Sequence, residues 1–323
     1  MDNSGKTYFL VGGCPRSGTT LLASMLGASP ECVAPPESDF VIPLARALKA
    51  GQVAPTVDAM RAFISGHWRF RFWNVTLGNH RLDVTDHDNI WAIYAAVIFD
   101  VVDHYARAQG KPDWKVWIDH RPDNIRWVSF LNKVFLSSEF VHVVRDGRAV
   151  AHSVIPLDWG ANDVLTAADF WTSRTAYGLA AETTLTGHVH RMRYEDIVER
   201  PEVELQRLCK STGLGYCPAM LLGGGSEVPV YTRAQHALVG QGVQSSRKDI
   251  WKTHFTARQV EIFENKAGWL LEQLAYDCDR AMIAKGPSFS ERAHSRIVAQ
   301  FLTVRINRYR GKLRQARGLA APQ

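Results

Sequence analysis

The chain has 323 residues, of which 46% are hydrophobic and 22% charged, an ordinary balance for a globular protein that can bury a large core without disulfides. The formal net charge of +6 is not spread evenly, because residues 291–323 hold eight Lys/Arg and one acidic residue, which leaves 30 basic and 31 acidic residues for the rest. A domain that grips a duplex normally carries positive charge on its folded face, so we expect no nucleic-acid partner.

The cysteines and the hydropathy pattern exclude several other classes. The start of the chain has no basic cluster followed by a long apolar core, and no stretch approaches the ~18 consecutive apolar residues that a membrane span needs. The cysteines are odd in number and widely spaced, with no pair that suggests a metal site: Cys14, Cys32, Cys209, Cys217 and Cys278. Together these absences predict a reduced, cytoplasmic protein without a metal site.

Strands and helices are expected to alternate along the chain. Four β-prone runs are recognised, at residues 7–11, 114–118, 140–144 and 188–193. Each is followed by apolar residues at helical spacing, through residues 21–26, 125–135, 148 onward and 203–208. Further helical patterns cover residues 90–108, 167–185 and 256–274, and glycines mark residues 223–250 as loop. This alternation predicts an α/β fold in three layers, with a parallel β-sheet flanked by helices on both faces.

The end of the chain differs from the rest. We expect one folded domain over residues 1–286 and a basic C-terminal helix or tail over residues 287–323, with apolar residues at helical spacing on one side. Such a helix suits peripheral contact with an anionic membrane surface, but it could equally cap the domain or pair with another subunit. The sequence leaves the oligomeric state open.

The first strand runs into a glycine-bounded loop, GCPRSGTT at residues 13–20, that opens a helix. Glycines let successive backbone N–H groups point at one anion, and the helix N-terminus adds partial positive charge. Ordinary triphosphate-binding loops carry Lys directly after the second glycine. Here that position is Thr19 and the cation is Arg16, inside the loop, which favours a donor shorter than a triphosphate.

This loop is similar to the PKSGTT or PRSGTT loop of the sulfotransferase family, whose donor is 3′-phosphoadenosine 5′-phosphosulfate (PAPS). The resemblance implies a P-loop-like sulfotransferase fold and transfer of a sulfuryl group to an acceptor hydroxyl, with adenosine 3′,5′-bisphosphate as product and no metal required. The acceptor would be a carbohydrate, a lipid or a small-molecule alcohol or phenol. The residues implied to hold the 5′-phosphosulfate are Arg16, Ser17, Gly18, Thr19 and Thr20. Arg16 would also neutralise charge on the leaving phosphate oxygen, as a catalytic residue.

A second phosphate motif is expected after the third strand. Residues 143–153, VVRDGRAVAHS, resemble the 3′-phosphate motif of the same family, in which the strand-end Arg145 and the later Ser153 contact the phosphate. A planar guanidinium at the carboxyl edge of a parallel strand suits a phosphate bound there. The alternative is a structural ion pair between Arg145 and Asp146.

Two further segments resemble segments of the same family and follow in the same order along the chain. Residues 246–256, SRKDIWKTHFT, look like the late RKGxxGDWKNxFT segment of cytosolic sulfotransferases, although this copy is three residues shorter and has no Gly after Lys248. The resemblance implies that Arg247 and Lys248 close over the 3′-phosphate, and the alternative is a solvated basic loop. Residues 193–196 match the RYED segment, which implies that Tyr194 lies beside the adenine, unless it only packs in the core.

Two residues are candidates for the base that takes the proton of the acceptor hydroxyl. Glu37 follows the first helix at the distance at which tyrosylprotein sulfotransferases place a catalytic Glu. His120, in IDHRP at residues 118–122, matches the KTHLP strand end whose His is the base in cytosolic sulfotransferases. We rank Glu37 slightly ahead, and both could act, one as base and one as positioner. The alternatives are a helix-starting acid and a His that orients a loop.

Aromatic side chains gather after the first helices and could face the acceptor or form the core of a helical subdomain: His67, Trp68, Phe70, Phe72, Trp73 and Trp91.

Two rival functions remain. A P-loop kinase would need Lys after Gly18 and an Asp for Mg²⁺, and Asp146 is the residue placed to imitate that Asp. A catalytically silent nucleotide-binding protein would bind the donor product without turnover.

Overall fold

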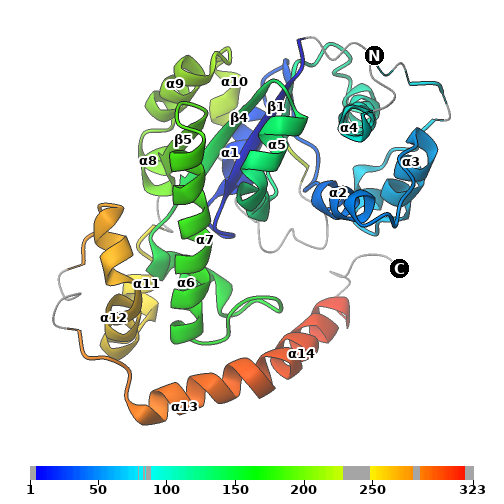
Figure 1. Ribbon diagram of the computed structural model, residues 1–323. Helices are drawn as coiled ribbons and strands as arrows, with labels where there is room; N and C mark the ends of the chain where they lie inside the picture. The colour runs from blue at the N-terminus through cyan, green and yellow to red at the C-terminus, as the bar shows by residue number, and fades with distance from the viewer. Residues whose placement is uncertain are drawn as a thin grey trace.

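The computed structural model describes residues 5–78, 80–82, 84, 89–227, 248–278 and 284–316. Within these ranges one parallel sheet has the order β2-β3-β1-β4-β5. Its strands are β1 (Thr7–Gly13), β2 (Cys32–Val33), β3 (Val116–Asp119), β4 (Ser138–Val144) and β5 (Val189–Arg193). The expected α/β fold is therefore confirmed (Figure 1). The two-residue β2 was not predicted, because so short a strand has no periodicity of its own.

Helices connect the strands and cover both faces of the sheet. Those of the first half are α1 (Thr19–Leu26), α2 (Val41–Lys49), α3 (Val57–Gly66), the 3₁₀ turn η1 (Phe70–Trp73), α4 (Ile90–Ala108), the 3₁₀ turn η2 (Pro122–Trp127) and α5 (Val128–Val134). Those of the second half are α6 (Gly147–Val154), α7 (Val164–Thr184), α8 (Tyr194–Glu199), α9 (Pro201–Thr212), α10 (Ala219–Leu222), α11 (Trp251–His254), α12 (Ala257–Gln273), α13 (Phe289–Ile297), the π-helical turn η5 (Val298–Leu302) and α14 (Thr303–Ala316).

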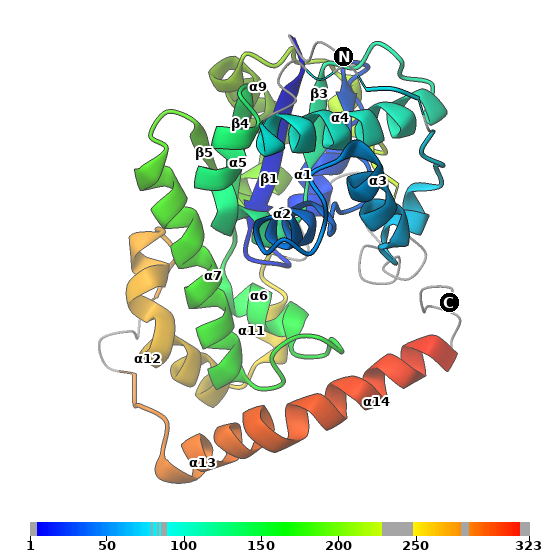
Figure 2. The ribbon, with the colours of Figure 1, turned by 45° about the vertical axis from the view of Figure 1, so that its right-hand side comes forward.

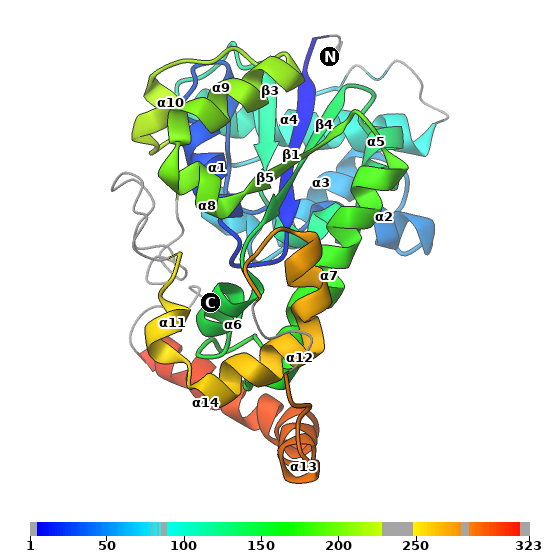
Figure 3. The same ribbon diagram turned by 90° about the vertical axis from the view of Figure 1, so that its left-hand side faces the viewer.

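Alternation along β1 divides the core into two layers. Tyr8 and Leu10 pack with residues of α2, α4 and α5, whereas Phe9 and Val11 pack on the opposite face with residues of α1 and α9. A strand buried on both faces needs apolar residues at successive positions, and this sequence supplies them. Figure 3 shows α8, α9 and α10 on the face opposite α3 and α4.

The C-terminal helices form an arm that runs along the loop after α6 (Figure 2). Arg310 on α14 donates from Nη1 to the carbonyl oxygens of Ile155 (2.7 Å) and Leu157 (3.1 Å). Ser295 on α13 donates to Asp163, the residue that caps α7. The arm is thus attached to the loop that follows the second phosphate motif.

Two points concern the rest of the chain. None of the described helices combines the length and apolar character that crossing a bilayer requires. The loop expected at residues 223–250 falls largely on residues outside the described ranges.

The carboxyl ends of β1, β3, β4 and β5 meet at one edge of the sheet, as parallel strands require. The loop after β1, the strand end at His120, Arg145 after β4 and Tyr194 after β5 all lie at this edge. The fold therefore gathers there the motifs that the sequence had singled out.

Candidate functional site

The loop after β1 has the backbone that an anion-binding turn needs. Gly13 and Gly18 have φ values of +145° and +100°, and Arg16 between them has φ +75°. A Cβ at Gly13 would lie 2.4 Å from the carbonyl oxygen of Val143, and one at Gly18 would lie 2.5 Å from the ring of Tyr194. The left-handed backbone at Arg16 costs roughly 1–3 kcal/mol, a strain that clusters at ligand-binding turns.

Hydroxyl groups line the same turn. Ser17, Thr19 and Thr20 are all buried, and Gly18 caps α1 without any side-chain acceptor. The Oγ of Ser17 has no hydrogen-bond partner among the described residues. A buried hydroxyl without a partner is costly, and an anion at the N-terminus of α1 would satisfy it together with the first N–H groups of the helix.

The structure joins the first motif to the second through direct contacts. Arg16 donates from Nε to Ser153 Oγ (3.0 Å), and Arg145 donates from Nη1 to the carbonyl oxygen of Arg16 (3.0 Å). These residues lie 137 and 129 positions apart in sequence. The Arg145 guanidinium lies 4.1 Å above the Tyr194 ring centroid, and its carbonyl oxygen accepts from Trp171. Two guanidiniums and several hydroxyls thus converge on one place, as a doubly phosphorylated ligand needs.

Asp146 is held by a different arginine. It caps α6 by accepting from the backbone N–H of Arg148 (2.8 Å), and its Oδ2 accepts from Arg148 Nη2 (2.8 Å). Arg148 also donates to Glu264 (2.6 Å). The expected alternative, an ion pair between Arg145 and Asp146, is replaced by this pairing, which leaves Arg145 directed at the loop.

The late basic segment is only partly described. Arg247 lies outside the described residues, and Lys248 forms an ion pair with Glu199 at the end of α8. Lys248 also lines a cavity of about 800 Å³ with Arg148 and Glu195. The contact of both basic residues with a 3′-phosphate stays a prediction. Tyr194 is buried between Gly18 and Arg145, so it packs the loop against the strand end, and its contact with an adenine also stays a prediction.

On the acceptor side, two carboxylates and two arginines form an ion cluster that the sequence analysis missed. Arg69 Nη1 lies 3.1 Å and Arg121 Nη1 lies 3.3 Å from Glu37 Oε2. Arg121 Nε lies 2.8 Å from Asp39 Oδ1, and Arg69 also contacts Asp39. We call Glu37, Asp39, Arg69 and Arg121 the ion cluster.

The pKa of the Asp39 carboxyl is raised from 3.8 to about 6, chiefly by burial and in part by the neighbouring Glu37, against the lowering effect of Arg121 and Arg69. The available sequence signals were modest: Asp39 follows Glu37 by two residues and Arg121 follows His120 directly. The sequence contained no such signal for Arg69. This residue directly precedes η1, and it meets the segment after β2 through the fold.

Asp119 holds the segment around Glu37 in place through hydrogen bonds. Its Oδ2 accepts from the hydroxyl of Tyr8 (2.8 Å) and the amide of Asn124 (2.9 Å), and its Oδ1 accepts from the hydroxyl of Ser38 (2.7 Å). In the sequence, Ser38 lies between Glu37 and Asp39, the two carboxylates of the ion cluster. The buried Asp119 therefore positions the segment that carries Glu37.

His120 lies beside the same segment. Its Nε2 is 3.0 Å from the carbonyl oxygen of Pro35, two residues before Glu37. Because a carbonyl only accepts, Nε2 donates this hydrogen bond, and Nδ1 is buried without a partner among the described residues. The two candidate bases therefore lie near each other in the chain's fold, because His120 contacts the segment that carries Glu37. The side chain of Glu37 is 24% exposed, whereas His120 is 3% exposed, so Glu37 is more accessible to an acceptor.

Two of the six aromatic residues expected near the acceptor belong to the core. Phe70 and Trp73 are buried and pack edge-on against Phe40. Trp68 is 46% exposed, lies edge-on to Phe72, and has the guanidinium of Arg69 4.9 Å from its ring centroid. Of the described members of the group, Trp68 is the exposed ring in direct contact with the ion cluster.

Comparisons with known proteins agree with this geometry. A family model described as "Sulfotransferase family" matches residues 9–218. Nodulation protein NoeE of Sinorhizobium fredii is 26% identical over 315 residues, which cover 87% of this chain and 70% of that protein. Protein-tyrosine sulfotransferase 1 of Danio rerio is 28% identical over 233 residues, which cover 68% of this chain and 56% of that protein.

Two solved structures share the fold. The sulfotransferase domain from the curacin biosynthetic pathway has a TM-score of 0.55 at 19% identity, covering 84% of this chain and 98% of that domain. The sulfotransferase domain from the Synechococcus PCC 7002 olefin synthase has a TM-score of 0.53 at 21% identity, covering 84% of this chain and 94% of that domain. At these identities the likeness concerns the fold alone.

Proposed function

Because the chain belongs to the sulfotransferase family, we propose that it transfers a sulfuryl group from PAPS to an acceptor hydroxyl and releases adenosine 3′,5′-bisphosphate. The observation that carries this proposal is the convergence of Arg16, Ser153 and Arg145 beside the strained turn after β1. One cation of this set belongs to the loop and the other to a strand end, so together they suit a nucleotide with phosphates at both ends.

The residues of this chain would divide the donor between them. The turn at residues 13–20 would hold the 5′-phosphosulfate with its N–H groups and hydroxyls, and Arg145 with Ser153 would hold the 3′-phosphate. Arg247 and Lys248 would close over the 3′-phosphate, and Tyr194 would lie beside the adenine. The buried hydroxyl of Ser17, which lacks a partner among the described residues, supports an anion in the turn.

Sulfuryl transfer resembles phosphoryl transfer, in which positioned cations stabilise charge on the outer and leaving oxygens. The bond between sulfur and the bridging phosphate oxygen breaks as the acceptor oxygen bonds to sulfur, and the acceptor proton passes to the base. Arg16 would neutralise the leaving oxygen. This chemistry needs no metal, so we expect turnover to continue in the presence of a chelator.

For the base we propose Glu37, with His120 as a positioning residue. Glu37 is the more exposed of the two and stands among the guanidiniums of the ion cluster. His120 bonds to Pro35 in the same segment, so it would hold that segment against β3. The greater exposure of Glu37 and the contact of His120 with Pro35 therefore favour a Glu base, as in sulfotransferases with the PRSGTT loop, over a His base.

The acceptor would be a carbohydrate, a lipid or a small-molecule alcohol or phenol, for which the exposed ring of Trp68 offers an apolar face. One of the curated relatives is named for protein tyrosine, whose side chain is a phenol, which supports a phenol among these acceptors. No disulfide joins cysteines among the described residues, and Cys14, Cys32 and Cys209 are buried, which fits a reducing compartment such as the cytoplasm.

The arm of α13, η5 and α14 supports a peripheral membrane contact, because its exposed side combines basic residues with Phe289, Ile297 and Tyr309. Flotation with vesicles containing anionic lipid tests this: the full chain should float and a chain ending before residue 287 should not. Equal, negligible recovery of the two chains with the vesicles would remove the membrane contact. It would leave capping of the domain or pairing between subunits, and sedimentation would detect the pairing.

A P-loop kinase is disfavoured on two counts. Thr19 occupies the position of the triphosphate-binding Lys, and Asp146 is engaged by Arg148 instead of facing the loop. The test of the proposed function is turnover with radiolabelled PAPS and lysate fractions, with and without chelator. Label should pass to an acceptor in both conditions. Donor-product binding without any transfer would instead identify a catalytically silent nucleotide-binding protein, and a requirement for Mg²⁺ and ATP would identify a kinase.

A further inference from the structure

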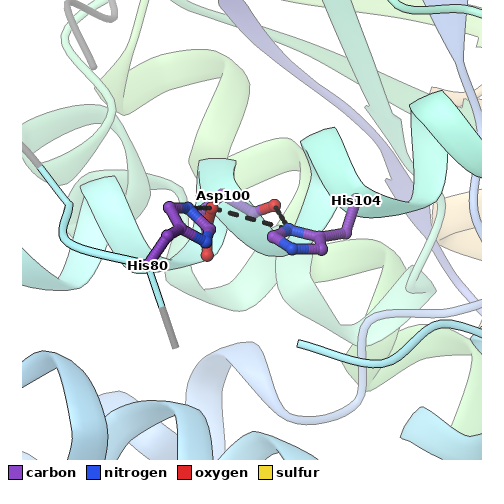
Figure 4. Close-up of side chains that lie close together, drawn as sticks. All are labelled: His80, Asp100 and His104. Atoms are coloured by element: carbon purple, nitrogen blue, oxygen red, sulfur yellow. Dashed lines mark hydrogen bonds and ion pairs between the residues drawn. The ribbon is translucent and has the colours of Figure 1, made fainter. Parts of the chain in front are cut away.

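Away from the donor loop and the ion cluster, three side chains of metal-binding type come together: His80, Asp100 and His104 (Figure 4). Asp100 and His104 lie one turn apart on α4, and His80 lies in the segment between η1 and α4. The sequence analysis expected no metal site and did not group these residues. The available signal was the i, i+4 spacing on α4, because His80 reaches α4 only through the fold.

The spacing of the ligand atoms suits one small ion. Asp100 Oδ1 lies 3.0 Å from His80 Nε2 and 3.5 Å from His104 Nδ1, and the ligand atoms of all three residues lie within 4.8 Å of one another. Two ligands of a tetrahedral zinc ion, with bonds of about 2.0–2.1 Å, are about 3.3 Å apart. The two measured distances fall on either side of that value, and an ion would replace the contacts of His104 Nδ1 with the carbonyl oxygen of Asp100 (2.9 Å) and of His80 Nε2 with Arg61 Nη2 (3.4 Å).

Outer hydrogen bonds already orient two of the three ligands. Arg61 on α3 donates from Nη2 (2.8 Å) and Nε (3.3 Å) to Asp100 Oδ2 and from Nη1 to the carbonyl oxygen of His80 (2.9 Å). Oδ1 of the buried Asp100 is thereby turned toward the imidazoles. Ligands held by such contacts bind metal more tightly. The positive charge of Arg61 competes with a cation for the same carboxylate, so we expect micromolar affinity instead of the tighter binding of closed structural sites.

The two imidazoles are open to solvent. The side chains of His80 and His104 are 43% and 23% exposed, and their rings stack with centroids 5.3 Å apart. An ion can therefore enter from solvent and keep a fourth position for water or an external ligand. Two imidazole nitrogens and one carboxylate oxygen favour zinc, cobalt, nickel or copper over magnesium or calcium.

We propose that His80, Asp100 and His104 form a binding site for a transition-metal ion of the zinc type. The ion would fasten the segment before α4 to that helix, within the layer of α2, α3 and α4. The site does not depend on the proposed sulfuryl transfer, because it shares no residue with the donor loop or the ion cluster.

Calorimetric titration of chelator-treated, dialysed protein with Zn²⁺ tests the site. One ion should bind per chain at pH 7.5. His80→Gln and His104→Gln should each lower the affinity at least tenfold. His254→Gln is the matched control, because His254 and His152 form another close pair, with ring centroids 4.7 Å apart. Absence of saturable binding, or loss of binding in the control alone, would overturn the proposal.

Cobalt substitution keeps the proposal testable if a variant fails to fold. The Co²⁺ complex of the unaltered chain should show visible bands of a low-symmetry site with nitrogen and oxygen ligands. A strong near-ultraviolet band from a cobalt–thiolate bond would show that a cysteine binds the ion, and would contradict the assignment. Thermal unfolding gives an independent measure: one equivalent of Zn²⁺ should raise the Tm of the unaltered chain and leave that of His80→Gln unchanged.

Discussion

The donor side and the acceptor side of the site are built in different ways. On the donor side, one short turn provides glycines, hydroxyls and Arg16 in succession, and two further residues, Arg145 and Ser153, contact it directly. On the acceptor side, the ion cluster draws its members from three segments, at residues 34–39, 67–73 and 119–123. A function carried by consecutive backbone groups can be recognised in a sequence, whereas one carried by side chains from separate segments becomes visible only in the fold.

This contrast predicts that damage to the acceptor side should stop turnover while nucleotide binding survives. Glu37→Gln removes the proposed base and should lower kcat by about 10²- to 10⁴-fold, with unchanged affinity for adenosine 3′,5′-bisphosphate. Glu31→Gln, at an exposed ion pair with Lys115, is the matched control and should keep full activity. Steady-state kinetics and calorimetry provide the two readouts.

His120→Ala sharpens the same comparison. As a positioning residue, it should lower kcat less than Glu37→Gln does and leave the shape of the pH–rate profile unchanged. A loss as large as that of Glu37→Gln, with the low-pH limb of the profile abolished, would make His120 the base. If neither variant lost more than about tenfold, the base would be a different group.

Damage to the donor side should affect both turnover and nucleotide binding. Arg16→Ala removes the cation of the turn and the bond to Ser153, and kcat should fall by about 10²- to 10³-fold, as when one charge-stabilising donor is lost. Affinity for the bisphosphate product should also fall. Arg46→Ala, at an exposed position of α2, controls for loss of a positive charge. Unchanged turnover in Arg16→Ala would remove the loop from the donor site.

Asp39 offers a smaller effect with a defined pH signature. Its pKa of about 6 lies above the ordinary value of 3.8, so the carboxyl gains a proton as pH falls through 6 and loses its attraction to Arg121. We expect kcat/KM to fall roughly tenfold below that pH as the ion cluster loosens, and Asp39→Asn to lack this limb. A limb near pH 6 that persists in Asp39→Asn would assign it to another group.

The same shift has a consequence for stability. The folded chain keeps a proton on Asp39 that the unfolded chain releases, so the contribution of Asp39 to the free energy of unfolding decreases as pH rises from about 4 to about 6. Denaturant unfolding of the unaltered chain and of Asp39→Asn across this window should show that decrease in the first and not in the second.

Trp68→Ala should have the smallest effect of the series. The exposed ring would contribute apolar contact to the acceptor, about 0.5–1.5 kcal/mol for an aromatic pairing, so KM for the acceptor should rise a few-fold with kcat unchanged. Trp269→Ala, at an exposed ring of α12, is the control. A fall in kcat instead of a rise in KM would show that Trp68 orients the reaction through Arg69.

The sequence predicted the parts of the fold in which local pattern and tertiary structure agree. β1, the turn after it and α1 follow directly from an apolar run, paired glycines and helical spacing, and the long helices α4 and α7 show in their periodicity. β2, which pairs with β3, was missed because two residues show no periodicity of their own. Phe70 and Trp73 were considered for the acceptor side, but their packing on Phe40 makes them core.

The same distinction applies to the site. Arg145 and Ser153 could be paired with the turn because a family-like motif contains both. It places Arg145 at a strand end and Ser153 on the helix that follows. Arg69 could not be paired with Glu37, because an ion pair between residues 32 positions apart leaves no periodic trace. Nor could His80 be placed beside α4, since nothing in the sequence indicates which side of the helix this residue contacts.

The central claim is that one adenosine nucleotide with phosphates at both ends binds between the turn after β1 and the end of β4. Calorimetry with adenosine 3′,5′-bisphosphate, without added metal, tests it most directly. The unaltered chain should bind one equivalent, more tightly than it binds ATP with Mg²⁺, and Arg145→Ala should weaken that binding at least tenfold. A folded chain that ignores the bisphosphate, or that prefers ATP with Mg²⁺, would contradict the claim.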